Sequence, residues 1–135
     1  MPIIMADHDV EGHLRVLIRK WTSPDFAELW AEVNCEFESF KRLGLEPDTP
    51  DCDVWRTCQQ RGIVLLTGNR NSLGDDSLEE TIRRESTPES LPVFTISSPT
   101  RLMKEPQYAE RVAARIHDYL RVLDRLRGSG RMFVP

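Results

Sequence analysis

The stretch Ile3-Ile4-Met5-Ala6-Asp7-His8-Asp9-Val10 decides the fold class, because an apolar run of strand length ends in two closely spaced acids. The apolar residues that follow recur at helical spacing and predict a helix over residues 10–20: Val10, Leu14, Leu17, Ile18 and Trp21. A short buried strand that leads into an amphipathic helix is typical of α/β folds. Open α/β folds bind ligands at the carboxyl edge of the sheet, where this junction would lie.

Asp7 and Asp9 are therefore the first candidate site residues. Two carboxylates at this spacing in a turn can share one hard divalent cation, because Mg²⁺ and Mn²⁺ prefer oxygen ligands. The alternative is that Asp9 only caps the following helix and that Asp7 is a solvated strand end.

Composition limits the class of protein. The chain has 135 residues with 39% apolar side chains, so we expect a single domain over residues 1–135 with one sizeable core. A net charge of −4 argues against a protein coated in positive charge for nucleic acid, although a local basic strip remains compatible with it. No segment reaches the apolar length of a membrane span or has the pattern of a signal peptide, so we expect a cytoplasmic protein without membrane contact. The three cysteines form no CxxC pair, which is typical of reduced thiols and does not indicate a zinc site.

Three further apolar runs predict strands. Residues 63–67 form a continuous apolar run, the pattern of a central parallel strand buried on both faces. Residues 92–97 predict a third strand, and residues 131–134 predict a short edge strand. Together with the helices between them, these strands predict an α/β domain with a mostly parallel sheet flanked by helices.

The helical predictions cover four more segments. Ser23-Pro24-Asp25 predicts the start of a second helix, which the apolar spacing extends to about Leu43. This second helix carries many aromatic side chains. We favour packing in the core as their role, and contact with a partner subunit in a homodimer is the alternative. Residues 51–61 predict another helix, and Asp76-Ser77-Leu78-Glu79 predicts a capped helix through Glu85.

A long helix is predicted over residues 107–126, with an arginine strip opposite its apolar face. The strip consists of Arg111, Arg115, Arg121 and Arg125. A solvated helix face is the favoured explanation for these arginines, and a phosphate-binding surface is the alternative.

The order of these motifs resembles the PIN-like domains, and more narrowly the small DUF5615 (Mut7-C-like) group. The acidic turn of that group is matched by Met5-Ala6-Asp7-His8-Asp9, and its acidic helix start by Asp51-Cys52-Asp53-Val54. Its Thr-x-Asp-x-Asp turn is matched by Thr67-Gly68-Asn69-Arg70-Asn71. Residues 22–44 and 72–91 fit the small version of the family poorly.

The resemblance implies a metal-dependent ribonuclease in which clustered carboxylates hold Mg²⁺ or Mn²⁺. Asp7 would be the central ligand with Asp9 beside it, and Asp51 or Asp53 would supply a second carboxylate. The turn residues Thr67, Asn69, Arg70 and Asn71 are then the substrate-binding candidates. RNA would be the substrate, and a toxin-like role would add a cognate protein partner.

The sequence departs from the family at the polar turn. Asn69 and Asn71 stand where the family has aspartates, and an amide offers a carbonyl oxygen without negative charge. Asp75 is a candidate replacement ligand, while Asp76 is equally well explained as a helix cap.

Two other functions stay open. A PIN-like domain without catalysis would act as a binding or assembly module, which Asn69 and Asn71 favour. A haloacid-dehalogenase-like phosphatase would use Asp7 as nucleophile, Asp9 as general acid/base and Thr67 or Asn69 as phosphate holder. The spacing of its later motifs argues against the phosphatase.

Overall fold

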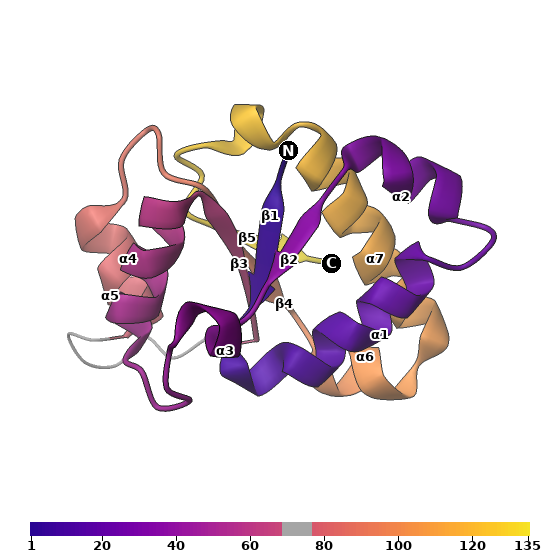
Figure 1. Ribbon diagram of the computed structural model, residues 1–135, viewed down its shortest axis with the longest axis horizontal. Helices are drawn as coiled ribbons and strands as arrows, with labels where there is room; N and C mark the ends of the chain where they lie inside the picture. The colour runs from indigo at the N-terminus through magenta and orange to yellow at the C-terminus, as the bar shows by residue number, and fades with distance from the viewer. Residues whose placement is uncertain (69–76) are drawn as a thin grey trace.

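A computed structural model describes residues 1–68 and 77–135 of the chain. The strands in these ranges form one parallel five-stranded sheet with the order β2-β1-β3-β4-β5 (Figure 1). The strands are β1 (Ile3–Ala6), β2 (Glu36–Glu38), β3 (Ile63–Thr67), β4 (Val93–Ile96) and β5 (Arg131–Val134). The prediction of an α/β fold with a parallel sheet flanked by helices is confirmed.

Helices cover both faces of the sheet, as Figure 1 shows. One face carries α1 (Glu11–Trp21), α2 (Ala27–Val33), α6 (Pro99–Lys104) and α7 (Pro106–Arg121). The opposite face carries α4 (Asp51–Arg61) and α5 (Leu78–Glu85). The short elements are α3 (Phe40–Leu43) and two 3₁₀ helices, η1 (His8–Val10) and η2 (Leu123–Leu126). Within the two ranges that the structure describes, no helix is long and apolar enough to cross a membrane.

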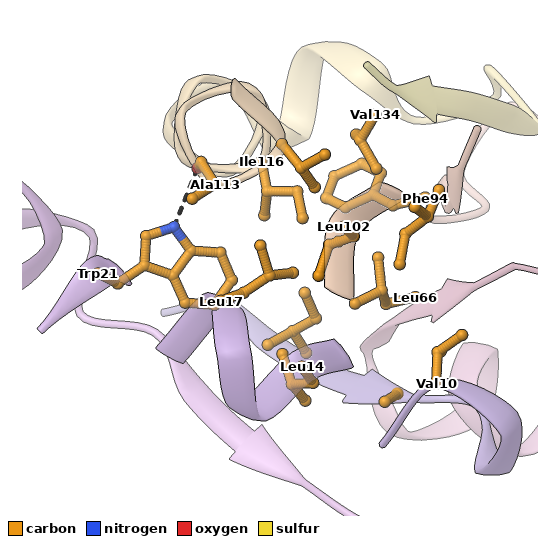
Figure 2. Close-up of a cluster of buried hydrophobic side chains, with 14 of the residues drawn as sticks. Val10, Leu14, Leu17, Trp21, Leu66, Phe94, Leu102, Ala113, Ile116 and Val134 are labelled. Carbon is orange, nitrogen blue, oxygen red and sulfur yellow. Dashed lines mark hydrogen bonds between the residues drawn. The ribbon is translucent and has the colours of Figure 1, made fainter. Parts of the chain in front are cut away.

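The sheet separates two hydrophobic clusters, because successive strand side chains point to opposite faces. In β3, Val64 and Leu66 pack toward α1 and α7, whereas Ile63 and Leu65 pack toward α4 and α5. On the larger side, Trp21 is fully buried and its Nε1 donates to the Ala113 carbonyl oxygen at 2.9 Å (Figure 2). This bond fixes the end of α1 against α7.

The predicted helix from Pro24 to Leu43 is wrong. Helix α2 ends at Val33, because Asn34 adopts a left-handed conformation with φ 53°. Strand β2 follows and pairs with β1, so Glu36 lies opposite Ile3 at the edge of the sheet. Most aromatic side chains of this segment pack into the core on the α1 side, in agreement with the favoured explanation. Phe40 packs into the core on the α4 side.

Three other boundaries differ from the predictions. The long helix ends at Arg121 and continues only as the 3₁₀ helix η2, and α6 was not predicted. Helix α5 begins after Ser77, whose Oγ accepts the Glu80 backbone N–H at 3.2 Å, so the cap is one residue later than Asp76. The other predicted helices and strands are confirmed with small shifts at their ends.

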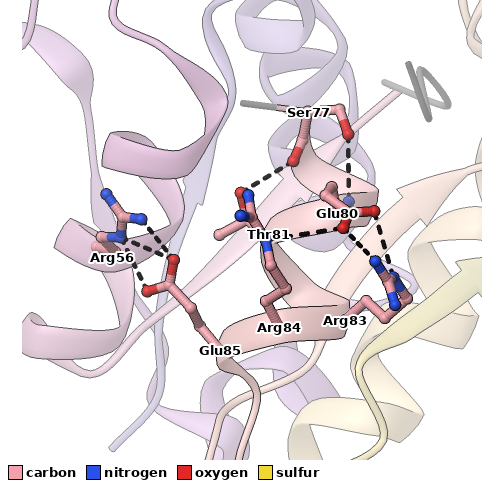
Figure 3. A network of polar contacts seen from close by, with 7 residues as sticks. All are labelled: Arg56, Ser77, Glu80, Thr81, Arg83, Arg84 and Glu85. Atoms are coloured by element: carbon pink, nitrogen blue, oxygen red, sulfur yellow. Dashed lines mark hydrogen bonds and ion pairs between the residues drawn. The ribbon is translucent and has the colours of Figure 1, made fainter. Parts of the chain in front are cut away.

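A polar network fixes α5 against α4 (Figure 3). Arg56 Nε donates to both carboxylate oxygens of Glu85, at 2.9 and 3.1 Å, and this hydrogen bonding lowers the pKa of Glu85. Within α5, Thr81 Oγ1 donates to the Ser77 carbonyl oxygen at 2.9 Å, and Glu80 pairs with the exposed Arg83. Helix α4 carries Asp51 and Asp53, so the network helps to hold the element that presents these acids.

Candidate functional site at the carboxyl edge of the sheet

The strand order places a topological switch point at the carboxyl ends of β1 and β3. In a sheet of order 2-1-3-4-5 the connections from these two strands run to opposite sides, and ligands bind at that point. Asp7 follows β1, and its backbone N–H donates to the Leu66 carbonyl oxygen at 2.7 Å. Thr67 ends β3, and its Oγ1 donates to Asp7 Oδ2 at 3.1 Å. Asp7 and Thr67 therefore lie at the same edge of the sheet.

Asp7 is a half-buried carboxylate with two fixed partners. Its Oδ1 accepts the His8 backbone N–H at 2.8 Å, which caps η1, and its Oδ2 accepts the Thr67 hydroxyl. Burial raises the pKa of Asp7 above its ordinary value, and the negative charges of Asp51 and Asp9 raise it further, against the two hydrogen bonds. Acids from η1 and from α4 therefore act on one carboxylate at the carboxyl edge of the sheet.

The two acids at the start of α4 have different surroundings. Asp51 is half-buried, and its charge acts on Asp7. Asp53 is exposed, and its Oδ1 lies 3.5 Å from Arg56 Nη1. Of the two alternatives for a second carboxylate, Asp51 is the one that the structure couples to Asp7.

The ligand set for a cation is incomplete in the part of the chain that the structure describes. Within residues 1–68 and 77–135, no group of three or more His, Cys, Asp and Glu side chains is arranged to hold a metal ion. Asp9 is exposed in η1 and influences Asp7 through its charge. Four of the candidates lie outside the described residues: Asn69, Arg70, Asn71 and Asp75.

Close packing surrounds the end of β3. A Cβ atom added to Gly68 would lie 2.7 Å from Pro99 Cγ and 3.3 Å from Val10 Cγ1. Glycine at this position therefore lets the chain leave β3 between η1 and α6. Cys58 of α4 is buried in the core, and burial together with the Asp7 charge raises the pKa of its thiol to about 12. Cys58 is thus a neutral core residue at physiological pH.

Comparison with known proteins gives no family. No family model matches the chain, and neither curated proteins nor solved structures match it. The PIN-like resemblance therefore rests on the sequence motifs alone.

A small cavity adjoins this edge on the α1 side of the sheet. It has a volume of about 180 Å³, and its polar lining consists of Arg15, Ser39 and the two acids Glu11 and Glu38. Phe37 and Ala6 form part of its apolar lining. A Cβ atom added to Gly12 would lie 3.6 Å from Arg15 Nη2, so the guanidinium folds back toward the start of α1. This cavity is not evident from the sequence, because apolar spacing predicts a helix at Phe37 and Ser39, which belong to β2 and to the cap of α3.

Proposed function

We propose that the chain is a Mg²⁺- or Mn²⁺-dependent ribonuclease with its site at the carboxyl edge of β1 and β3. The observation that carries the proposal is the half-buried carboxylate of Asp7, with the charges of Asp9 and Asp51 acting on it from separate elements. Like charges gathered in this way repel one another, and a bound cation relieves that repulsion.

The described residues suit the binding of a cation at this edge. Asp7 would be the central ligand, because Thr67 and the His8 N–H hold its carboxylate in one orientation. Asp51 and Asp9 would add negative charge around the cation. A divalent cation bound there would activate water and neutralise charge at the scissile phosphate.

The direct test is titration of the purified chain with MnCl₂, followed by incubation with labelled RNA, DNA and a phosphomonoester. We expect thermal stabilisation by Mn²⁺ and cleavage of RNA that depends on it. Asp51→Asn should weaken Mn²⁺ binding about ten-fold or more, whereas Asp53→Asn, its matched control on the same turn, should change it less than about two-fold. Phosphomonoester turnover without RNA cleavage would favour the phosphatase. Equal effects of the two substitutions would remove Asp51 from the site.

A binding module without catalysis is the second candidate, because Asn69 and Asn71 replace acids of the resembling family. The double substitution Asn69→Asp/Asn71→Asp separates the two candidates. If both side chains face the cation, we expect tighter Mn²⁺ binding by calorimetry and increased RNA cleavage, because the ligand charge count helps to set affinity. An unchanged affinity for Mn²⁺ would mean that the asparagines only form the turn, and would favour the binding module.

A further inference from the structure

A second cavity lies at the opposite, amino edge of the sheet. It has a volume of about 420 Å³, and three arginines from the C-terminal part of the chain line it: Arg121, Arg125 and Arg127. Apolar side chains, among them Leu91, Leu120 and Val122, form another part of the lining. In Figure 1 the segment after α7 lies beside the N-terminal end of β1, away from the start of α1. The cavity is therefore separate from the acidic edge.

The end of α7 brings these arginines together. On one continuous helix Arg121 and Arg125 would belong to the same strip as Arg111 and Arg115, but α7 stops at Arg121 and η2 follows. Arg111 and Arg115 stay on α7 and lie over tyrosine rings, with 5.4 Å to the Tyr108 centroid and 5.8 Å to the Tyr119 centroid. The turn at the helix end instead directs Arg121 and Arg125 to the cavity.

Arg127 is fixed in place before any ligand binds. Its Nε donates to Asp124 Oδ1 at 3.1 Å, and its Nη1 donates to the Glu89 carbonyl oxygen at 2.9 Å. The next residue is also anchored, because the Gly128 N–H donates to the Ser90 carbonyl oxygen at 2.8 Å. A guanidinium held by two bonds loses little conformational entropy when it binds an anion.

The charges at this edge do not cancel. One explanation for arginines near a helix C-terminus is that they offset the partial negative charge of that helix end, which is about half an elementary charge for each helix. Helices α4 and α7 both end at this cavity, and Asp124 adds one negative charge. Three guanidinium groups exceed that sum by about one positive charge. The excess favours an anion.

We propose that this cavity binds a phosphorylated small molecule with an aromatic or apolar body, such as a nucleoside monophosphate. The arginines would hold the phosphate, because guanidinium groups form bidentate hydrogen bonds with phosphate oxygens. A volume of about 420 Å³ exceeds what one phosphate needs, and the apolar lining suits the rest of the ligand. The phosphate would belong either to a free nucleotide or to the 5′ end of an RNA product.

The test is calorimetric titration of the full chain in EDTA, which removes any contribution from cations at the acidic edge. The probes are AMP, adenosine and inorganic phosphate. We expect AMP to bind at least about ten-fold more tightly than either of the other two. Arg125→Gln should weaken AMP binding about ten-fold, whereas Arg115→Gln, an exposed arginine of α7 outside the cavity, should change it less than about two-fold. Circular dichroism and thermal melting check that both variants are folded.

A second arm distinguishes the two sources of the phosphate. A short 5′-phosphorylated oligonucleotide that binds more tightly than AMP, with the same loss in Arg125→Gln, would identify an RNA end as the ligand. Equal weakening by Arg115→Gln and Arg125→Gln would overturn the proposal in favour of diffuse attraction. Adenosine binding as tightly as AMP would also overturn it. So would the absence of AMP binding at about 10 mM, ten times the Kd of about 1 mM that a weak specific site would have.

Discussion

Asp7→Asn is expected to lower Mn²⁺-dependent RNA cleavage by about 100-fold or more and to remove stabilisation by Mn²⁺. The substitution removes one negative charge from the centre of the acidic edge while the size of the side chain stays the same. An amide can still accept the His8 N–H and contact Thr67, so the fold should be preserved. Rates with labelled RNA and melting curves with and without MnCl₂ measure both effects.

Without metal, the same variant should be more stable than the wild type at neutral pH. In the folded chain the pKa of Asp7 is raised by burial, so the native state binds more protons than the unfolded state above the ordinary value of 3.8. The wild-type free energy of unfolding therefore falls as pH rises through the interval between the unfolded and folded pKa values. Asp7→Asn lacks this loss and should melt roughly 2–6 °C higher at pH 7 in EDTA.

The matched control is Asp48→Asn, which changes an exposed acid in the loop before α4. It should leave cleavage, Mn²⁺ stabilisation and the melting temperature within error of the wild type. Cleavage that persists in Asp7→Asn would exclude Asp7 as the central ligand. An unchanged pH dependence of melting would show that its carboxylate is solvated like that of Asp48.

Trp21→Ala is expected to cost about 3–5 kcal/mol of the free energy of unfolding, the usual range for removing a buried tryptophan. The side chain is fully buried, stacks on Trp30 with ring centroids 3.9 Å apart, and donates to the Ala113 carbonyl oxygen. Urea titration followed by circular dichroism measures the loss. The melting temperature should fall by roughly 10 °C or more.

Trp21→Phe separates packing from hydrogen bonding, because it keeps an aromatic ring but removes the Nε1 donor. It should cost about 1–2 kcal/mol, near the usual value for one buried hydrogen bond with some loss of packing. A loss as large as that of Trp21→Ala would mean that the bond to Ala113, rather than the stack, fixes α1 on α7. No loss in either variant would contradict the packing of this cluster.

The central strands could be predicted because their sequences contain little else than apolar residues. Residues 63–67 are buried on both faces of the sheet, and a continuous apolar run is the direct signature of that position. The edge strand β2 has no such signature. Its three residues are Glu36, Phe37 and Glu38, and only its pairing with β1 makes it a strand. Asn34 was the local signal for the helix end, since asparagine tolerates the left-handed conformation of a C-cap.

The candidate site was predictable only in part. The position of Asp7 follows from the junction of strand and helix, and its contact with Thr67 follows from parallel strands that end at one edge. The difference between Asp51 and Asp53 depends on the rotation of α4 and on the ion pair with Arg56, and neither can be read from spacing alone. The arginine cavity was missed because helical periodicity was extended past Arg121, where α7 ends.

The interior place of β1 in the sheet, between β2 and β3, also sets an order of events during protein synthesis. Strand β1 leaves the ribosome before β3, its neighbour in the sheet, which ends at Thr67, sixty residues after Asp7. At about 5–20 residues per second, the nascent chain spends several seconds with Asp7 exposed and its partner strand absent. The contact between Asp7 and Thr67 forms only after β3 has emerged. The proposed ribonuclease site would therefore be inactive while β1 is still close to the RNA of its own ribosome.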